Sequence, residues 1–224
     1  FLLIASLIAP TVNALSAPIA PPPASNFFTI SAMDKPNSLP LRMANRERHL
    51  VFANNPPSGK VRLAGPYIDN KGQMCGSFFI VEGSRGDVEN FVKCDPYGTS
   101  GLFQTCEIEG FSWKLNPPDA SMGGSSPAAG RMFSLLRCLD MPEVAPIRQE
   151  HGDAHRRHVS GYGDKVLCEG HVVDDDGRTC GSIFLLDLGS LEAGDFVKKD
   201  PFHLAGVYRS AEVRPWRCVI DHRG

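Results

Sequence analysis

Apolar and polar positions alternate along this chain with two periods, one typical of strands and one typical of helices. In the first half, the period of two and the flanking turn residues predict strands at Phe27–Ser31, Lys60–Pro66, Cys75–Glu82 and Phe103–Phe111. A longer helix is predicted after Ser38, a shorter one at Asp87–Lys93. Strand, helix, two strands, helix, strand is the order of a ferredoxin-like unit, an α+β fold.

The longer predicted helix carries two different faces. Ser38 is the expected N-cap, and Pro40 suits the first turn. One face holds the apolar residues Leu39, Met43 and Leu50. Another face holds Arg42, Arg46 and His49, which share it at spacings i, i+4 and i+7.

A long stretch of this pattern occurs twice. Residues Lys60–Leu115 and Lys165–Ile220 superpose at a constant offset of 105 without a gap. The matches include Lys60/Lys165, Gly65/Gly170, Gly72/Gly177, Cys75-Gly76-Ser77/Cys180-Gly181-Ser182, Phe91-Val92-Lys93/Phe196-Val197-Lys198, Asp95-Pro96/Asp200-Pro201 and Gly101/Gly206. This period is too long for a solenoid repeat, so we interpret the chain as two tandem copies of one small domain.

The repeat sets the predicted domain boundaries. The first domain covers residues 26–116 and the second covers 131–220, followed by a short tail at 221–224. Between them, residues 117–130 are rich in Pro, Gly, Ser and Ala, which is typical of a flexible linker. Residues 1–25 form a targeting segment and a Pro-rich linker.

Composition narrows the function classes. The net charge of −2 gives no field that attracts nucleic acid, so no nucleic-acid partner is predicted. Seven cysteines, an odd number without C-x-x-C spacing, favour a reducing compartment. The spacing of Cys168, His171 and Cys180 fits no standard zinc pattern, so no metal is predicted. Neither a dinucleotide fingerprint nor a P-loop occurs, so no cofactor is implied.

The first copy resembles the YCII-related domains, small α+β proteins of the dimeric α-β barrel superfamily. The resemblance rests on the turn Asp34–Ser38, Arg42-x-x-x-Arg46-x-x-His49, Leu63–Pro66, Gly76-Ser77, Asp95-Pro96-Tyr97 and Ser100–Phe103. The second copy resembles the same family more loosely. The resemblance implies that two ferredoxin-like units pair their sheets into a barrel, here as a pseudo-dimer within one chain. Further self-association of such chains remains an open alternative.

The resemblance also implies a pocket that holds a histidine and an aspartate. These are His49 and Asp95 in the first copy, and His155 and Asp200 in the second. A neutral imidazole takes a proton near pH 7, and a carboxylate orients it. Around this pair, the expected substrate-binding residues are Arg42, Arg46, Ser38 and Tyr97, together with Arg148 in the second copy.

Each of these residues has a structural alternative. Asp95, which precedes a proline, is also a helix N-cap, and His49 near a helix end also interacts with the helix dipole. The two arginines of the first copy also suit a solvated stripe, Ser38 an N-cap and Tyr97 a packing role.

The second copy departs from the motif around its His-Asp pair. Ala64-Gly65-Pro66 becomes Glu169-Gly170-His171, and Arg46 becomes Gly152. Tyr97 becomes Phe202, and the Asn37-Ser38 pair becomes Glu143-Val144. These changes put a second equivalent active site in doubt, and the sequence does not decide whether the second copy is active.

Two functions follow for a chain with this resemblance. One is a cofactor-independent lyase or isomerase that abstracts a proton from a small hydroxylated aromatic or a lactone. That reaction needs a base, an orienting acid and a dry pocket. The other is a non-catalytic small-molecule binding or assembly module, because a fold alone does not decide function.

The N-terminal residues predict a targeting signal. Phe1–Ala9 is an apolar run too short to span a bilayer, and Val12-Asn13-Ala14 is a small-residue cleavage site. Leu15–Ser25 is free of charge and rich in Pro and Ala. This arrangement resembles the bipartite presequences of algae with complex plastids, so an organelle is predicted, with secretion as the alternative. No membrane association of the mature form is expected.

Residues before Ser25 are therefore expected to be absent from the mature protein or disordered, because a signal of this kind is removed on targeting. Intact-mass measurement on protein from its native source checks this expectation. A mature chain that begins upstream of Phe1 would contradict it.

Overall fold

A computed structural model describes residues 26–117 and 128–223, so the predicted targeting segment and most of the predicted linker lie outside the described residues. The first domain contains β1 (Phe27–Asp34), α1 (Leu39–Asn54), β2 (Lys60–Ile68), β3 (Met74–Glu82), α2 (Arg85–Cys94), α3 (Pro96–Thr99) and β4 (Phe103–Leu115). The second contains β5 (Met132–Asp140), α4 (Ala145–Ser160), the 3-10 turn η1 (Gly163–Lys165), β6 (Val166–Val173), β7 (Thr179–Leu186), α5 (Ser190–Lys199), α6 (Pro201–Leu204), β8 (Tyr208–Arg217) and β9 (Ile220–Asp221).

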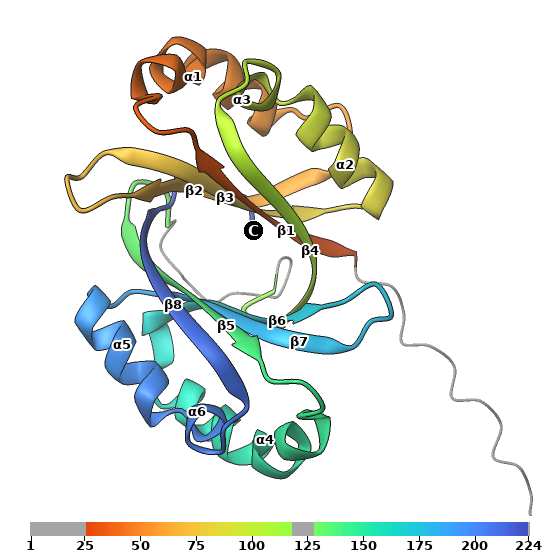
Figure 1. Ribbon diagram of the computed structural model, residues 1–224, viewed down its shortest axis with the longest axis vertical. Coiled ribbons are helices and arrows are strands. Elements are labelled where there is room, and N and C mark those ends of the chain that lie inside the picture. Colours follow the sequence, from red (N-terminus) through yellow and green to blue (C-terminus); the bar gives the residue numbers. More distant parts are fainter. Residues whose placement is uncertain (1–25, 118–127, 224) are drawn as a thin grey trace, which may run out of the picture.

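All strands belong to one sheet that closes on itself. Its order is β3-β1-β4-β6-β7-β5-β8-β2-β9, and β2 also pairs with β3. The helices of the first domain cover the outside at one end and those of the second domain cover the other end (Figure 1). This confirms the predicted α+β fold, with two ferredoxin-like units forming a barrel-like pseudo-dimer within one chain. None of the helices in the described residues is both long and apolar enough to cross a membrane.

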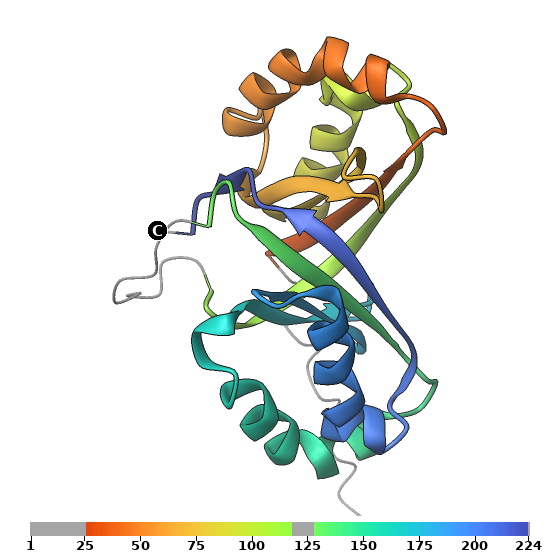
Figure 2. The same cartoon turned by 90° about the vertical axis from the view of Figure 1, so that its left-hand side faces the viewer.

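The last strand of each domain joins the two halves. β4 pairs with β6 from Gly110↔Val173 to Leu115↔Glu169. In the other direction, β8 pairs with β2 at Trp216↔Tyr67, and β9 follows at Ile220↔Ala64. These two crossings are equivalent in the repeat, and Figure 2 shows β8 running from the second domain up to the first. Pairing between the domains covers sheet edges that each domain alone would expose.

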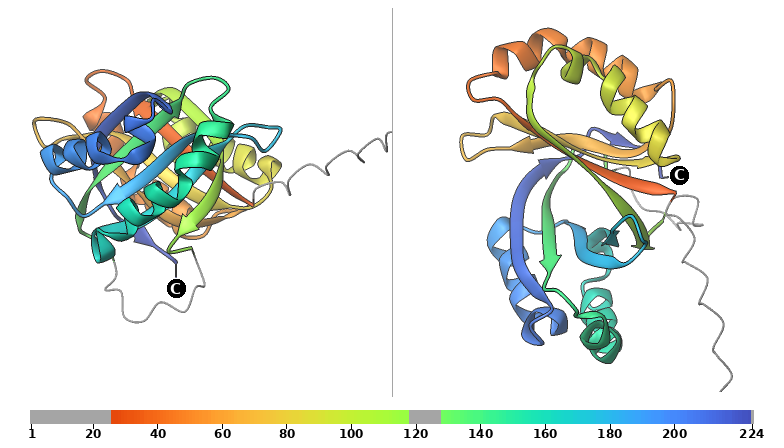
Figure 3. Two further views of the ribbon diagram at one scale, coloured as in Figure 1. Left: turned by 90° about the horizontal axis from the view of Figure 1, so that it is seen from below. Right: turned by 45° about the vertical axis from the view of Figure 1, so that its right-hand side comes forward.

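Three apolar cores result from this arrangement. The central core lies between the two halves of the sheet, where their strands cross (Figure 3), and it includes the fully buried rings of Phe78, Phe111 and Trp216. The Trp216 indole also donates a hydrogen bond to the Gly65 carbonyl across the domain boundary, at 3.0 Å. Two outer cores lie between each sheet and its own helices. The central core is therefore shared by both domains.

Helix α1 packs two polar residues, rather than its apolar stripe, against the sheet. Its buried residues are Arg42, His49 and Ala53, whereas Met43 is 52% exposed. Arg42 and His49 therefore lie against the sheet, where carboxylates and a hydroxyl satisfy them, whereas Arg46 is exposed. Ser38 precedes the helix as predicted, but its side chain makes no capping hydrogen bond and instead donates to the Lys35 carbonyl at 2.6 Å.

The crossings depend on glycine at one repeated position. A methyl group built on Gly65 would lie 1.8 Å from the Arg217 carbonyl oxygen, which belongs to the other domain. At the equivalent Gly170, it would lie 2.3 Å from the Phe111 ring. The repeated glycine is therefore required by close approach of the two domains.

We expect Gly65→Ala to lower the free energy of unfolding by about 1–3 kcal/mol or more, because it forces the crossing strands apart. The matched control is Gly194→Ala in α5, where a methyl group meets nothing within 4 Å. This control should be neutral or stabilise by up to about 1 kcal/mol. Urea unfolding measures both variants, and equal stability of the two would show that the crossing tolerates a side chain.

Candidate active site

Each domain holds a buried histidine–aspartate pair at the end of its longer helix. His49 Nδ1 lies 2.7 Å from Asp95 Oδ1, and His155 Nδ1 lies 2.7 Å from Asp200 Oδ1. An ionised carboxylate only accepts hydrogen bonds, so Nδ1 carries the proton in both pairs. The same Oδ1 of Asp95 accepts the Tyr97 backbone N–H at 3.0 Å. Capping of the short helix and orientation of the imidazole therefore coexist in one carboxylate.

An aromatic ring fixes each imidazole from one side. His49 stacks on Tyr97 with 3.8 Å between the ring centroids, and His155 stacks on Phe202 with 4.0 Å. Because Nδ1 is held by the aspartate and the ring plane is held by stacking, the direction of Nε2 is set in both domains. Tyr97 and Phe202 are buried and serve this packing role.

The predicted anion-binding arginines are already paired. Arg42 binds both carboxylate oxygens of Asp34, at 2.6 and 2.8 Å. Arg148 does the same with Asp140, at 2.7 Å each. Their charges are therefore balanced within the protein, which buried ions require. One nitrogen of these guanidinium groups is not satisfied: Arg148 Nη1 is buried without a hydrogen-bond partner among the described residues.

These two aspartates were not among the predicted site residues, although the sequence carries a signal for them. Asp34 and Asp140 each stand eight residues before their arginine, at equivalent places in the repeat. Tyr208, also absent from the predicted site, donates its hydroxyl to Asp200 Oδ2 at 3.2 Å. The equivalent residue of the first domain is Phe103, which has no hydroxyl. The second His-Asp pair thus has one additional hydrogen bond.

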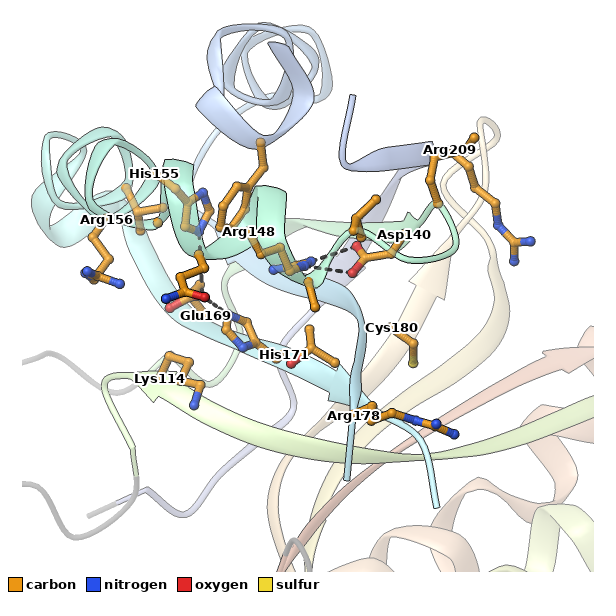
Figure 4. A pocket seen from close by; sticks show the side chains of 18 of the residues that line it. Lys114, Asp140, Arg148, His155, Arg156, Glu169, His171, Arg178, Cys180 and Arg209 are labelled. Carbon is orange, nitrogen blue, oxygen red and sulfur yellow. Dashed lines mark hydrogen bonds and ion pairs between the residues drawn. The ribbon is translucent and has the colours of Figure 1, made fainter. Parts of the chain in front are cut away.

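The two domains differ sharply in the space beside their histidines. The second-domain pocket, a cavity of about 1190 Å³, is lined by His155, Arg148, Glu169, His171 and Phe202, and also by Lys114 and Leu115 from the first domain. The first-domain pocket, beside His49, Arg46 and Tyr97, measures about 30 Å³. Figure 4 shows the side chains of the larger pocket. The volume of the second-domain pocket suits a small organic ligand. Ser38, which was predicted to bind substrate, is not among the residues that line the first-domain pocket.

Substitutions at equivalent positions account for this difference. Val219 and Ile220, from the end of the second domain, wall the first-domain pocket beside Arg46. In the second domain, Gly152 stands at the position of Arg46 and lines the larger cavity together with Lys114 and Leu115, the equivalents of Val219 and Ile220. The departures of the second copy from the family motif, which put a second site in doubt, thus occur in the domain that has the large cavity. The larger space beside a histidine thus lies in the second domain, where the sequence had put an equivalent site in doubt.

Glu169 and His171, which have no counterparts in the first domain, lie near the imidazole of His155. Glu169 Oε1 lies 4.0 Å from His155 Nε2 and 3.8 Å from His171 Nε2. Burial alone would lower the pKa of His155, but the hydrogen bond to Asp200 and the nearby Glu169 carboxylate outweigh it and raise this pKa. Burial, with the positive charges of Arg148, Lys114 and His155, lowers the pKa of His171 to about 3.

Among the described residues, the cysteines and histidine that the sequence places near this region do not form a metal site. Cys168 is fully buried and Cys180 contacts the Val172 carbonyl. In the part of the chain that the structure describes, no group of three or more His, Cys, Asp or Glu side chains is arranged to hold a metal ion.

Comparisons with known proteins agree with this architecture. The sequence profile of the YCII-related domain matches twice, over residues 26–112 and 132–217. No curated protein matches the sequence. Among solved structures, the 5-chloro-2-hydroxyhydroquinone dehydrochlorinase TftG from Burkholderia phenoliruptrix, in complex with 2,5-dihydroxybenzoquinone, is 32% identical over 39% of this chain and 93% of its own, with a TM-score of 0.34.

Two more distant structures cover nearly the whole chain. A putative monooxygenase from Lactobacillus acidophilus is 10% identical over 90% of this chain and 97% of its own, with a TM-score of 0.56. A mutant chlorite dismutase from Candidatus Nitrospira defluvii is 12% identical over 88% of this chain and 92% of its own, with a TM-score of 0.55. At such identities the likeness shows the fold alone.

The low pKa of His171 predicts a pH-dependent stability. Between pH 6.5 and 3 the unfolded chain binds a proton at this residue that the folded chain does not bind. The free energy of unfolding therefore falls on acidification, by up to about 1.4 kcal/mol per pH unit from this group. We expect His171→Gln to lose about 2 kcal/mol less than the wild type between pH 7 and pH 5. Urea unfolding at both pH values measures this, and identical losses would contradict it.

Proposed function

The chain belongs to the YCII-related domain family in both of its halves, and on this premise we propose that it is an enzyme acting on a small molecule in the second-domain pocket. The reaction is a proton transfer of the lyase or isomerase type, and the substrate is a small hydroxylated aromatic or a lactone. One observation carries the proposal. His155 Nε2 and Arg148 Nη1 are both buried without a hydrogen-bond partner among the described residues, and both belong to residues that line this cavity.

Unpaired buried polar atoms of this kind are costly in a folded protein, so they mark a place where a ligand supplies the missing partner. Two of them line the same wall, because Arg148 and His155 are seven residues apart on α4 and therefore share one helical face. A substrate with one oxygen near the guanidinium and one transferable proton near the imidazole would satisfy both.

The imidazole is arranged for proton transfer. Asp200 holds Nδ1–H, so Nε2 is the atom that faces the ligand. Tyr208 in turn donates to Asp200 and keeps the carboxylate in place. Stacking on Phe202 prevents the ring from turning away. The positioned ring needs no cofactor to exchange a proton with a substrate.

The guanidinium is arranged to stabilise an oxyanion. Asp140 binds two of its nitrogen atoms, and Ser182 accepts from Nη2 at 3.1 Å, which leaves Nη1–H for the substrate. Removing a proton from carbon next to a carbonyl places negative charge on the oxygen, and a preorganised donor in a dry site stabilises that charge. Phenolic and lactone oxygens both fit this role.

The first domain supports a different use of the same framework. His49, Asp95, Arg42 and Tyr97 repeat the geometry, but the adjoining space of about 30 Å³ leaves no room for such a substrate. We propose that this pair is structural. A His-Asp pair is therefore compatible with a non-catalytic role, which keeps a small-molecule binding module as the second candidate for the open pocket.

We expect His155→Ala to abolish turnover in a screen of small hydroxylated aromatics and lactones, with a loss of about 10²–10⁴-fold, because it removes the proton-transfer group. His49→Ala is the matched control and should retain turnover once circular dichroism shows that it is folded. Ligand affinity is measured in parallel by calorimetry. Turnover lost only in His49→Ala would contradict the assignment, and binding without turnover in the wild type would favour the binding module.

A further inference from the structure

Glu169 is a carboxylate placed against the candidate imidazole in one domain only. It is 7% exposed, lies on β6 and corresponds to Ala64 in the first domain. Its Oε1 is 4.0 Å from His155 Nε2, on the side of the ring opposite to Asp200. The imidazole of His155 thus has a carboxylate at each nitrogen, one in direct contact and one across a gap.

We propose that Glu169 is a second catalytic residue of the pocket, which takes a proton from the substrate while the His155 imidazolium gives one back. The reaction of this site is then an isomerisation, in which a proton moves between two nearby atoms of an unsaturated lactone or related carbonyl compound. This inference rests on the proposed function of the second-domain pocket, since it assigns the direction of proton transfer there.

The gap between the two groups is the first reason. A separation of 4.0 Å is too long for a direct hydrogen bond, so neither atom satisfies the other. A ligand atom at about 2.8 Å from both atoms fits between them as a bent bridge. The base and the acid therefore reach the same side of one small molecule, as a proton shift over a short distance requires.

The protonation of the site is the second reason. Burial opposes a charge on His155, but the Asp200 hydrogen bond and the Glu169 carboxylate outweigh it and raise its pKa. His171, on the other side of Glu169, has its pKa lowered to about 3 and stays neutral. The raised pKa favours the imidazolium form of His155, the form that donates a proton, and the Glu169 carboxylate is the oxygen group on its other side. The charged or titratable groups around His155 are Asp200, Glu169, His171, Lys114, Arg148, Arg156 and His158.

The step balances within the site. A Glu169 oxygen takes a proton from the carbon beside the lactone carbonyl. The two electrons of the broken C–H bond then form a dienolate, whose oxygen accepts a hydrogen bond from Arg148 Nη1–H. The dienolate then takes the Nε2 proton of His155 at the far carbon of the conjugated unit, where a new C–H bond forms. Glu169 ends protonated and His155 ends neutral, and one proton returns from the first to the second through water.

The first test follows the His155 imidazole by NMR and needs no substrate. Glu169→Gln keeps the shape of the side chain and removes its charge, so we expect the pKa of His155 to fall. Glu169→Asp should restore part of the shift. Glu150→Gln is the matched control and should leave the pKa of His155 unchanged. Glu150 is an exposed carboxylate on α4, the helix that carries His155, and it does not line the pocket. An unchanged His155 titration in Glu169→Gln overturns the pairing.

The second test uses α-angelica lactone, an unsaturated five-membered lactone that isomerises by moving a ring proton. In D₂O the wild type should isomerise it and incorporate deuterium, and Glu169→Gln should be slower by about 10²-fold or more, with Glu169→Asp intermediate. A wild type that isomerises the lactone no faster than Glu169→Gln does, with the same pH profile, overturns the inference but leaves the proposed function standing. If the pKa shift of His155 is present but the wild type neither isomerises the lactone nor exchanges its protons, the catalytic role of Glu169 is refuted. If the wild type also turns over no compound of the wider screen, the proposed function is refuted as well.

Discussion

The pairing of each domain's last strand with the other domain's sheet is the interaction on which the rest of this structure depends. It closes the sheet, buries the central core and brings the end of one domain to the mouth of the other domain's pocket. Leu115 lies opposite Glu169 as Ile220 lies opposite Ala64. Neither pocket is therefore complete within one domain, which links the stability of the barrel to the shape of the site.

A common polar framework lies under both pockets. In each domain an arginine is bound by an aspartate and a histidine by another, all of them largely buried. Charges in such places destabilise a fold by about 3–5 kcal/mol when one partner is lost, so the framework persists as a unit even where no ligand fits. This explains how one copy can keep the side chains of a site after its cavity has been filled.

The two copies then differ through a few residues around that framework. Arg46, Val219 and Ile220 line the small space beside His49, while Gly152, Lys114 and Leu115 stand at the equivalent positions of the larger cavity. In the second copy the added carboxylate of Glu169 stands where the first has a methyl group, and the imidazole gains a partner on each side. Divergence within one chain has thus separated a structural pair from the pair that we propose to be catalytic.

The sequence by itself determined the repeat, the order of the elements and the identity of the two His-Asp pairs. Periodicity and turn residues are local properties, and the matching motif placed His49 with Asp95 and His155 with Asp200 across nearly fifty residues. Only the tertiary structure decided which pocket is open. A cavity is the volume that remains after all side chains around it are placed, and Ile220 and Lys114 enter these pockets from the other domain. The proximity of Glu169 and His155 was unpredictable for the same reason. The packing of a helix against a strand sets the distance between these two residues, and their spacing along the chain does not.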